Sequence, residues 1–213
     1  DVFTSISSQK LEGSLNASPY LITNLESELN GESFAIRSLN FDWSGNRGEV
    51  EGELFGIDKW GEGGAVKGNL NLKAESVVVG AILSWWDNFQ PDNQVNTQAT
   101  LLPFGSDLGV RITVDRLYWG NLECNSLTSR MKIGESRLAI SNATAQGLEG
   151  NARVEGSLRP GGSGWILGLS GTADNLSLPD LFKTYDNFGQ TTLRYDHVQG
   201  AVSAAGNINL EWD

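Results

Sequence analysis

The side chains that most readily carry out acid–base or nucleophilic chemistry are scarce in this sequence. Histidine occurs once, as His197 beside Asp196, and cysteine occurs once, as Cys124. A Ser-His-Asp triad needs its histidine, and one could be imagined from these residues and a distant serine. However, His197 lies in a short strand-like segment, LRYDHVQG, so we interpret it as a satisfied or exposed strand histidine. Cys124 is interpreted as a small apolar strand residue.

Metal and carboxylate chemistry are equally weakly indicated. One His and one Cys far apart do not form the cluster that a transition metal usually requires. Glu49, Glu51 and Glu53 alternate along one segment, which is typical of a solvated strand face. A carbohydrate-acting enzyme would need two opposed acids in a cleft, and the spacing singles out no such pair. No EF-hand loop, P-loop or dinucleotide fingerprint is present. We therefore expect no catalysis, no metal and no cofactor.

The charge balance excludes one class of partner. The net charge is −11, with 15 basic residues against 26 acidic ones. Nucleic-acid binding requires basic residues that replace phosphate counterions, so nucleic acid is not an expected partner. Electrostatic docking on an anionic membrane surface is disfavoured for the same reason. The chain also has 26 Gly and only 5 Pro, which favours tight turns over a helical bundle because Gly weakens helices.

Alternation of apolar and polar residues dominates the chain and predicts strands with one wet face. Apolar side chains fall at every second position in residues 39–44, 49–54, 69–74, 110–115, 151–158 and 207–212. Glycine-rich turn signals at 44–46, 61–64 and 160–164 separate several of these runs. Strands joined by short turns pair antiparallel, so the pattern predicts a meander.

Two segments break this period and are copies of each other. AESVVVGAILSWWDNF (74–89) aligns without a gap on ADNLSLPDLFKTYDNF (173–188), and both have helical spacing. Upstream, VEGEL (50–54) matches VEGSL (154–158), and FAI (34–36) matches LAI (138–140). We predict two β-rich repeat units, 1–102 with a helix near 79–87 and 103–213 with a helix near 178–186. Such repetition favours a laterally extended architecture, here one continuous sheet.

The second unit resembles a known family. VDRLYWGNLECNSLTSRMKIGESRLAISNATAQGLEGNARVEGSLRP, followed by LSGTADNLSLPDLFKTYDNFGQTTLRYDHVQGAVSAAGNINLEWD, is similar to the C-terminal region of AsmA-like proteins of Gram-negative bacteria, especially long Bacteroidetes members. The DNFGQT block is the most specific part. The resemblance covers nearly the whole chain, since residues 34–102 look like the preceding copy of the unit.

The resemblance implies a location and a role. AsmA-like and TamB-like proteins are tethered to the inner membrane, extend into the periplasm, and carry phospholipids or support outer-membrane assembly. Their long curved sheet forms a groove lined with apolar side chains. The family's N-terminal membrane helix is not found in this sequence, so we expect anchoring only through parts absent from this chain. We expect the chain to be an excised piece that works with other segments of a longer envelope protein.

Alternation and resemblance together predict a specific fold and a specific surface. The expected fold is mostly β: an elongated, curved antiparallel meander sheet with one apolar concave face, plus two short amphipathic helices. Phospholipid acyl chains are the expected partner, because each shielded CH₂ is worth about 0.8 kcal/mol. The predicted groove-lining residues are Phe41, Trp43, Leu70, Leu72, Ile112, Val114, Val154, Leu158, Leu167, Leu169, Ile208 and Leu210. A double block, Val114→Glu with Val154→Glu, is expected to stop transport and leave the fold recoverable.

The aromatic residues of the two helical blocks allow two interpretations. They are Trp85, Trp86 and Phe89 in the first block, and Phe182, Tyr185 and Phe188 in the second. The favoured interpretation is that they pack each helix onto its sheet, and the other is that they line the mouth of a groove. For the whole chain, the alternative function is a β-sandwich interaction or adhesion module of the cell envelope, whose two apolar faces would pack on each other.

Overall fold

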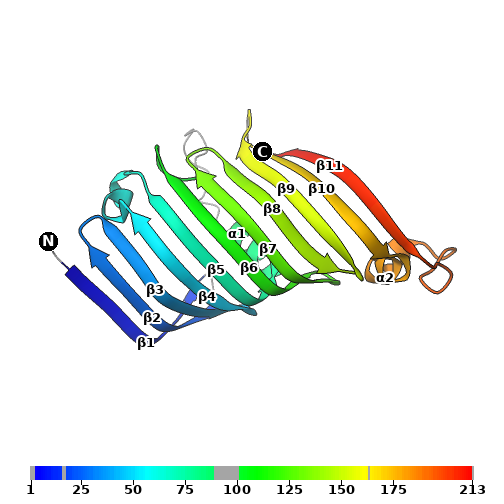
Figure 1. Cartoon of the computed structure of the whole chain (residues 1–213), viewed down its shortest axis with the longest axis horizontal. Coiled ribbons are helices and arrows are strands. Elements are labelled where there is room, and N and C mark those ends of the chain that lie inside the picture. The colour runs from blue at the N-terminus through cyan, green and yellow to red at the C-terminus, as the bar shows by residue number, and fades with distance from the viewer. Residues whose placement is uncertain (1–2, 16–17, 89–100, 163, 213) are drawn as a thin grey trace.

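The computed structural model describes residues 3–15, 18–88, 101–162 and 164–212. Its strands are β1 (Phe3–Leu15), β2 (Ser18–Asn30), β3 (Ser33–Trp43), β4 (Asn46–Phe55), β5 (Lys67–Val78), β6 (Asp107–Trp119), β7 (Leu122–Gly134), β8 (Leu138–Gly147), β9 (Gly150–Pro160), β10 (Trp165–Ser177) and β11 (Ala201–Trp212). The α-helices are α1 (Val79–Asn88) and α2 (Leu178–Thr184), and the short 3₁₀ helices are η1 (Ile57–Glu62) and η2 (Asp186–Gly189). All eleven strands lie in one sheet, in chain order from β1 to β11 (Figure 1).

This architecture confirms the predicted mostly β fold, with a single curved sheet and two short α-helices near the predicted positions. The predicted boundary between residues 102 and 103 lies in the connection between α1 and β6, and the sheet continues across it. The sheet forms a single layer in which β1 and β11 are the free edges (Figure 1). The eleven described strands therefore do not form the two packed sheets of a sandwich.

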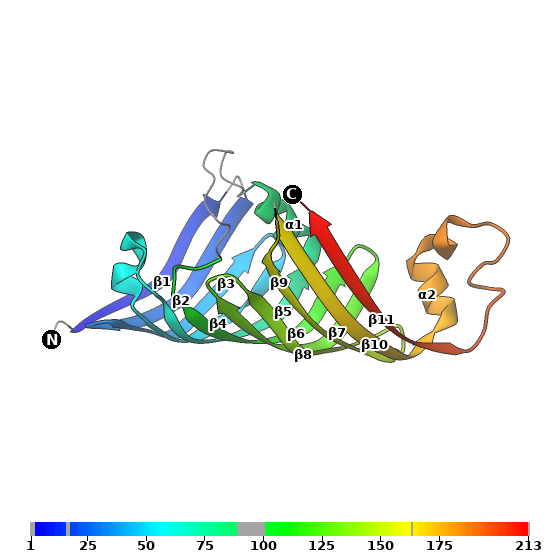
Figure 2. The same cartoon turned by 90° about the horizontal axis from the view of Figure 1, so that it is seen from above.

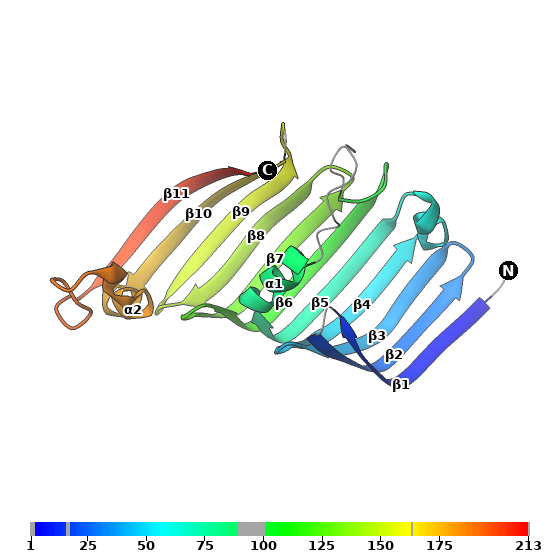
Figure 3. The same cartoon turned by 180° about the vertical axis from the view of Figure 1, so that it is seen from behind.

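One strand pair departs from the predicted antiparallel meander. Lys67 pairs with Asp107 and Val78 with Tyr118, so β5 and β6 run parallel. Parallel neighbours need a connection that returns to the starting end of the first strand, and this connection includes α1. Figure 3 shows α1 lying over one face of the sheet, across β6 and β7. The sequence predicts the helix but does not predict the direction of the next strand.

Irregular positions within the strands account for the curvature. The pairing register shifts between Thr23 and Glu26 in β2, and comparable shifts occur in β3, β5, β7, β8 and β10. Several shifts coincide with left-handed backbone at Asn24, Ser126, Asn142 and Asn175. A bulge leaves one residue unpaired, bends its strand and increases the local twist. Figure 2 shows the resulting curvature of the sheet from above.

Few apolar side chains are fully buried. Among the described residues they are Ala35, Val66, Ala74 and Val114, and Val114 is the least exposed at 2%. The accessible surface of the chain is 13944 Å². A compact monomer of 23.0 kDa would expose about 9,600 Å². The molecule is therefore an open sheet whose apolar side chains remain largely accessible from one side.

Candidate functional site

Cross-strand pairing identifies which side chains share a face of the sheet, because directly paired residues point to the same side. One continuous row of paired residues, named the Val110 row, crosses all eleven strands. It consists of Ile6, Ser27, Ile36, Gly52, Leu70, Val110, Met131, Ile140, Gly156, Leu169 and Ile208. Ser27 is the only polar member of this row.

A second row lies two residues further along each strand and therefore on the same face. This Leu108 row consists of Thr4, Leu29, Phe34, Leu54, Gly68, Leu108, Ile133, Leu138, Leu158, Leu167 and Leu210. Its only polar member is Thr4, on an edge strand. The two rows make an apolar band that runs across the full set of strands.

Glycines within the band give neighbouring side chains room to lie flat. A Cβ added at Gly52 would stand 3.0 Å from Leu70 Cδ2, and one at Gly156 would stand 2.4 Å from Leu169 Cδ2. Each leucine therefore covers the glycine directly opposite it. Where large side chains lie over glycines, the apolar surface stays smooth, and it is not interrupted by exposed backbone.

All twelve predicted groove-lining residues lie on this one face. Six of them belong to the two rows: Leu158, Leu167 and Leu210 to the Leu108 row, and Leu70, Leu169 and Ile208 to the Val110 row. The other six are on the same face through their strand partners: Leu72 with Ile112, Val154 with Gly171, Phe41 with Gly48, Val114 with Ala74, and Trp43 with Tyr20. Sequence reasoning did not name the members that complete the rows, such as Met131 and Ile140. Their apolar alternation was visible, but their place opposite other apolar residues depends on the strand register.

The aromatic residues of the second helical block contact one another. The rings of Phe182 and Phe188 meet edge to face with centroids 5.1 Å apart, and those of Tyr185 and Phe188 stack at 5.7 Å. Tyr185 and Phe188 are 48% and 55% exposed, so this cluster is not packed tightly against the sheet. In the first block, Phe89 lies outside the described residues, as do the side chains of Trp85 and Trp86.

The opposite face of the sheet is polar and carries many ion pairs. Lys73 Nζ lies 2.8 Å from Glu49 Oε1, and Arg37 Nη2 lies 2.7 Å from Glu28 Oε2. The hydrogen bond that Arg37 donates to Glu28 raises the pKa of the arginine. The alternating acids of β4 thus lie on a solvated, salt-bridged face.

The candidate catalytic side chains lie in exposed or half-buried positions, and His197 Nε2 lies 3.9 Å from Asp196 Oδ1. His197 lies in a turn, where its backbone N–H donates to the Arg194 carbonyl at 2.9 Å, so the strand-like interpretation of this segment was wrong. The turn forms because residues 191–200 connect η2 to β11 and have no strand partner. Cys124 is half-buried in β7, and burial, with the nearby Glu123 carboxylate, raises the pKa of its thiol. A raised pKa lowers the thiolate fraction at neutral pH, which disfavours nucleophilic chemistry.

Two further properties concern metals and membranes. Within the described ranges, no group of three or more His, Cys, Asp and Glu side chains is placed to hold a metal ion. Neither described helix has the length and apolar composition needed to cross a bilayer.

No protein-family model, curated protein or solved structure significantly matches the chain. The AsmA-like resemblance therefore stays an expectation drawn from the sequence motifs.

Proposed function

We propose that this chain is a periplasmic β module of an AsmA-like envelope protein that shields or conducts phospholipid acyl chains along its apolar face, without catalysis. The observation that carries the proposal is the apolar band formed by the Val110 and Leu108 rows, which crosses eleven strands almost without a polar side chain. The apolar face is covered near Val114, which is 2% exposed, but the eleven described strands carry no second sheet over the band. An apolar surface of this extent marks a binding surface in a soluble protein. The resemblance of the sequence motifs to AsmA-like proteins favours lipid as the occupant.

The dimensions of the band suit an acyl chain. Neighbouring strands are about 4.8 Å apart, so the rows extend for about 48 Å across the sheet. A bilayer core of about 30 Å holds two leaflets, so one acyl chain occupies about 15 Å. Each methylene that leaves water contributes about 0.8 kcal/mol. In this proposal the apolar face is the concave side of the sheet, and acyl chains lie parallel to the rows.

Accessibility of the face is part of the proposal. Ile208 and Leu210 on one edge strand are 53% and 52% exposed, and Ile6 on the other edge is 48% exposed. The outer backbone groups of β1 and β11 have no strand partner among the described residues, and such edges can pair with further strands. We propose that other segments of a longer envelope protein continue the sheet there and provide the tether to the inner membrane.

A matched pair of double variants tests the lipid proposal. Leu169→Glu with Ile208→Glu places two carboxylates on directly paired positions of the apolar face. Ser170→Glu with Asn207→Glu makes the same charge change on the same two strands but on the polar face, where these residues also pair directly. Phospholipid bound per protein after gentle purification is measured by native mass spectrometry. We expect a loss of about tenfold or more in the first variant only, because a buried carboxylate is strongly disfavoured next to hydrocarbon.

The outcome separates this function from the others considered. Wild-type protein without phospholipid, or equal lipid in both double variants, contradicts the proposal. Unfolding curves of both variants check that the sheet is intact. The double block at Val114 and Val154, expected from the sequence to leave the fold recoverable, is a poor test, because Val114 is 2% exposed and a charge there would destabilise the fold.

A further inference from the structure

Two arginines face each other at the centre of the polar face. Arg111 in β6 and Arg130 in β7 are direct cross-strand partners. Arg111 lies between Val110 and Ile112 in sequence, so it points away from the apolar band. Like charges placed directly opposite each other destabilise a sheet. Such a pair is therefore unfavourable unless something else neutralises it.

Among the described residues, no acidic side chain neutralises the two arginines. Within that part of the chain, neither guanidinium group makes an ion pair or a hydrogen bond. Some cations of this face are paired, as in the contact of 2.9 Å between Arg47 Nε and Asp42 Oδ2. Others, such as Arg153 and Arg159, make no ion pair among the described residues, but neither of them lies directly opposite another cation. What distinguishes Arg111 and Arg130 is that two unpaired cations are direct cross-strand partners.

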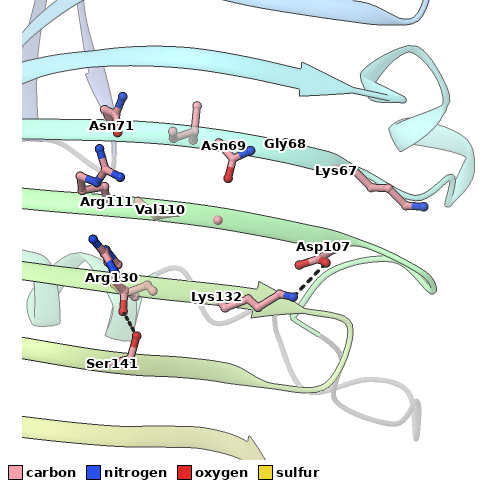
Figure 4. Close-up of a pocket in the computed structure, with 13 residues that line it drawn as sticks. Lys67, Gly68, Asn69, Asn71, Asp107, Val110, Arg111, Arg130, Lys132 and Ser141 are labelled. Atoms are coloured by element: carbon pink, nitrogen blue, oxygen red, sulfur yellow. Dashed lines mark hydrogen bonds and ion pairs between the residues drawn. The ribbon is translucent and has the colours of Figure 1, made fainter.

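Further polar and cationic groups surround the two arginines. They line a hollow of about 620 Å³ together with Lys67, Lys132, Asn69 and Asn71 (Figure 4). The one acid in its lining is Asp107, whose Oδ2 lies 3.1 Å from Lys132 Nζ. Gly109 stands between Asn69 and Lys132 in the register and leaves the floor of the hollow open. A Cβ at Gly109 would lie 2.5 Å from Asn69 Oδ1, so any larger residue would fill this space.

We propose that this hollow, the Arg111–Arg130 site, binds a phosphate- or sulfate-type oxyanion. The planar guanidinium group binds such oxyanions through two parallel hydrogen bonds. Directly paired residues on antiparallel strands have Cα atoms about 5 Å apart, so both side chains can reach one anion. The anion would neutralise the like-charge pair. Lys132, which also pairs with Asp107, and Asn71, whose Nδ2 also donates to Glu51 Oε1 at 3.4 Å, have further N–H donors nearby. The site is independent of the lipid proposal, since the apolar band lies on the other face.

Binding measurements on three proteins test the site. They are the wild type, the double variant Arg111→Gln with Arg130→Gln, and the control Arg153→Gln. In the strand register Arg153 lies opposite Thr144 and Thr172 and not opposite another cation. Inorganic phosphate and sulfate are titrated at constant ionic strength against chloride, with amide chemical shifts as the readout. A second arm uses phosphatidylcholine vesicles with and without phosphatidic acid. We expect binding to weaken about tenfold or more in the double variant and to stay unchanged in the control.

The two arms distinguish the sources of the oxyanion. Loss of dissolved phosphate binding in the double variant alone supports a site for a free anion. Binding limited to vesicles that contain phosphatidic acid, and lost in the double variant, supports a lipid headgroup. Binding in neither arm, or equal binding by the wild type and the double variant, overturns the proposal. Thermal unfolding provides a second readout: phosphate should raise the melting temperature of the wild type but not that of the double variant.

Discussion

The segment from β3 to α1 and the segment from β8 to α2 are built on the same plan. Each has two strands joined by a tight turn, a third antiparallel strand, and a helix that starts where that strand ends. The register shift between Ile36 and Leu39 in β3 recurs between Ile140 and Ala143 in β8. Corresponding sequence positions thus produce corresponding bends, so the shape of each segment is encoded locally.

The two segments differ in the direction of the strand after the helix. β6 runs parallel to β5, whereas β11 runs antiparallel to β10. A parallel return must span β5, which has 12 residues and is therefore about 40 Å long. Residues 89–106 can reach about 60 Å when extended, but residues 190–200 reach only about 38 Å. The first connection is thus long enough for a parallel return, whereas the second is shorter than the length of about 43 Å that a return along the 13-residue β10 would require.

A smaller difference concerns the backbone at the start of each helix. In the first segment the buried Asn46 accepts a hydrogen bond from the Val78 N–H at 2.9 Å through Oδ1. In the second segment the corresponding Ser177 N–H donates to the Leu148 carbonyl at 2.8 Å. The N–H before the helix is thus bonded to a side-chain oxygen in the first segment and to a backbone carbonyl in the second. A side-chain substitution can therefore remove this hydrogen bond in the first segment only.

The largest expected effect concerns Gly52 and Gly156, which lie beneath the side chains of Leu70 and Leu169. Gly52 has a φ of 152°, and an added Cβ would stand 2.2 Å from the Asn69 carbonyl oxygen. Gly52→Ala should lower the free energy of unfolding by about 3 kcal/mol, because the backbone cannot yield. At Gly156 the nearest atom is the movable Leu169 Cδ2, and the nearest backbone atom, the Gly168 carbonyl oxygen, would be 2.6 Å away. Gly156→Ala should therefore cost less than Gly52→Ala. Urea unfolding measures the free energy of unfolding of both variants. A larger loss of this free energy in Gly156→Ala than in Gly52→Ala would contradict the prediction.

The next effect concerns Asn46. Asn46→Ala leaves the Val78 N–H without its partner, and also removes the hydrogen bond of 2.9 Å that Nδ2 donates to the Trp43 carbonyl. We expect a loss of about 2 kcal/mol in unfolding free energy. The exposed Asn151 in the second segment is the control, and Asn151→Ala should change stability by less than about 0.5 kcal/mol. Equal losses at the two positions would show that Asn46 has no special role.

The smallest effect concerns the start of α2. The Ser177 hydroxyl accepts a hydrogen bond from the Asp180 N–H at 3.4 Å, a long distance for a helix cap. Ser177→Ala should therefore cost only about 0.5 kcal/mol, at the low end for the loss of a cap. Thermal unfolding of Ser177→Ala and of the control Ser170→Ala, on the exposed face of the same strand, measures the difference. A loss above about 2 kcal/mol would mean that Ser177 is needed for more than the cap.

Much of this fold could be predicted from the sequence because its determinants are local. Alternation in segments such as 69–74 sets strands and faces, and the copied blocks 74–89 and 173–188 predict both helices. Register could not be predicted, and register is what places Arg111 opposite Arg130. The bulges depend on left-handed backbone at Asn142 and similar residues, and most of the asparagines that the structure describes do not adopt it. The parallel β5–β6 pair depends on a connection whose path no pattern reveals.

The most direct test of the central claim uses corresponding positions in the two segments. Val50 and Val154 lie on the apolar face, and their neighbours Glu51 and Glu155 lie on the polar face. The photoreactive residue p-benzoylphenylalanine is placed at each position in turn, and cross-links to phospholipid are measured after irradiation in the presence of lipid. We predict cross-links from positions 50 and 154 and none above background from 51 and 155. Equal cross-linking from all four positions, or cross-linking from the polar face alone, would contradict a lipid-binding apolar face.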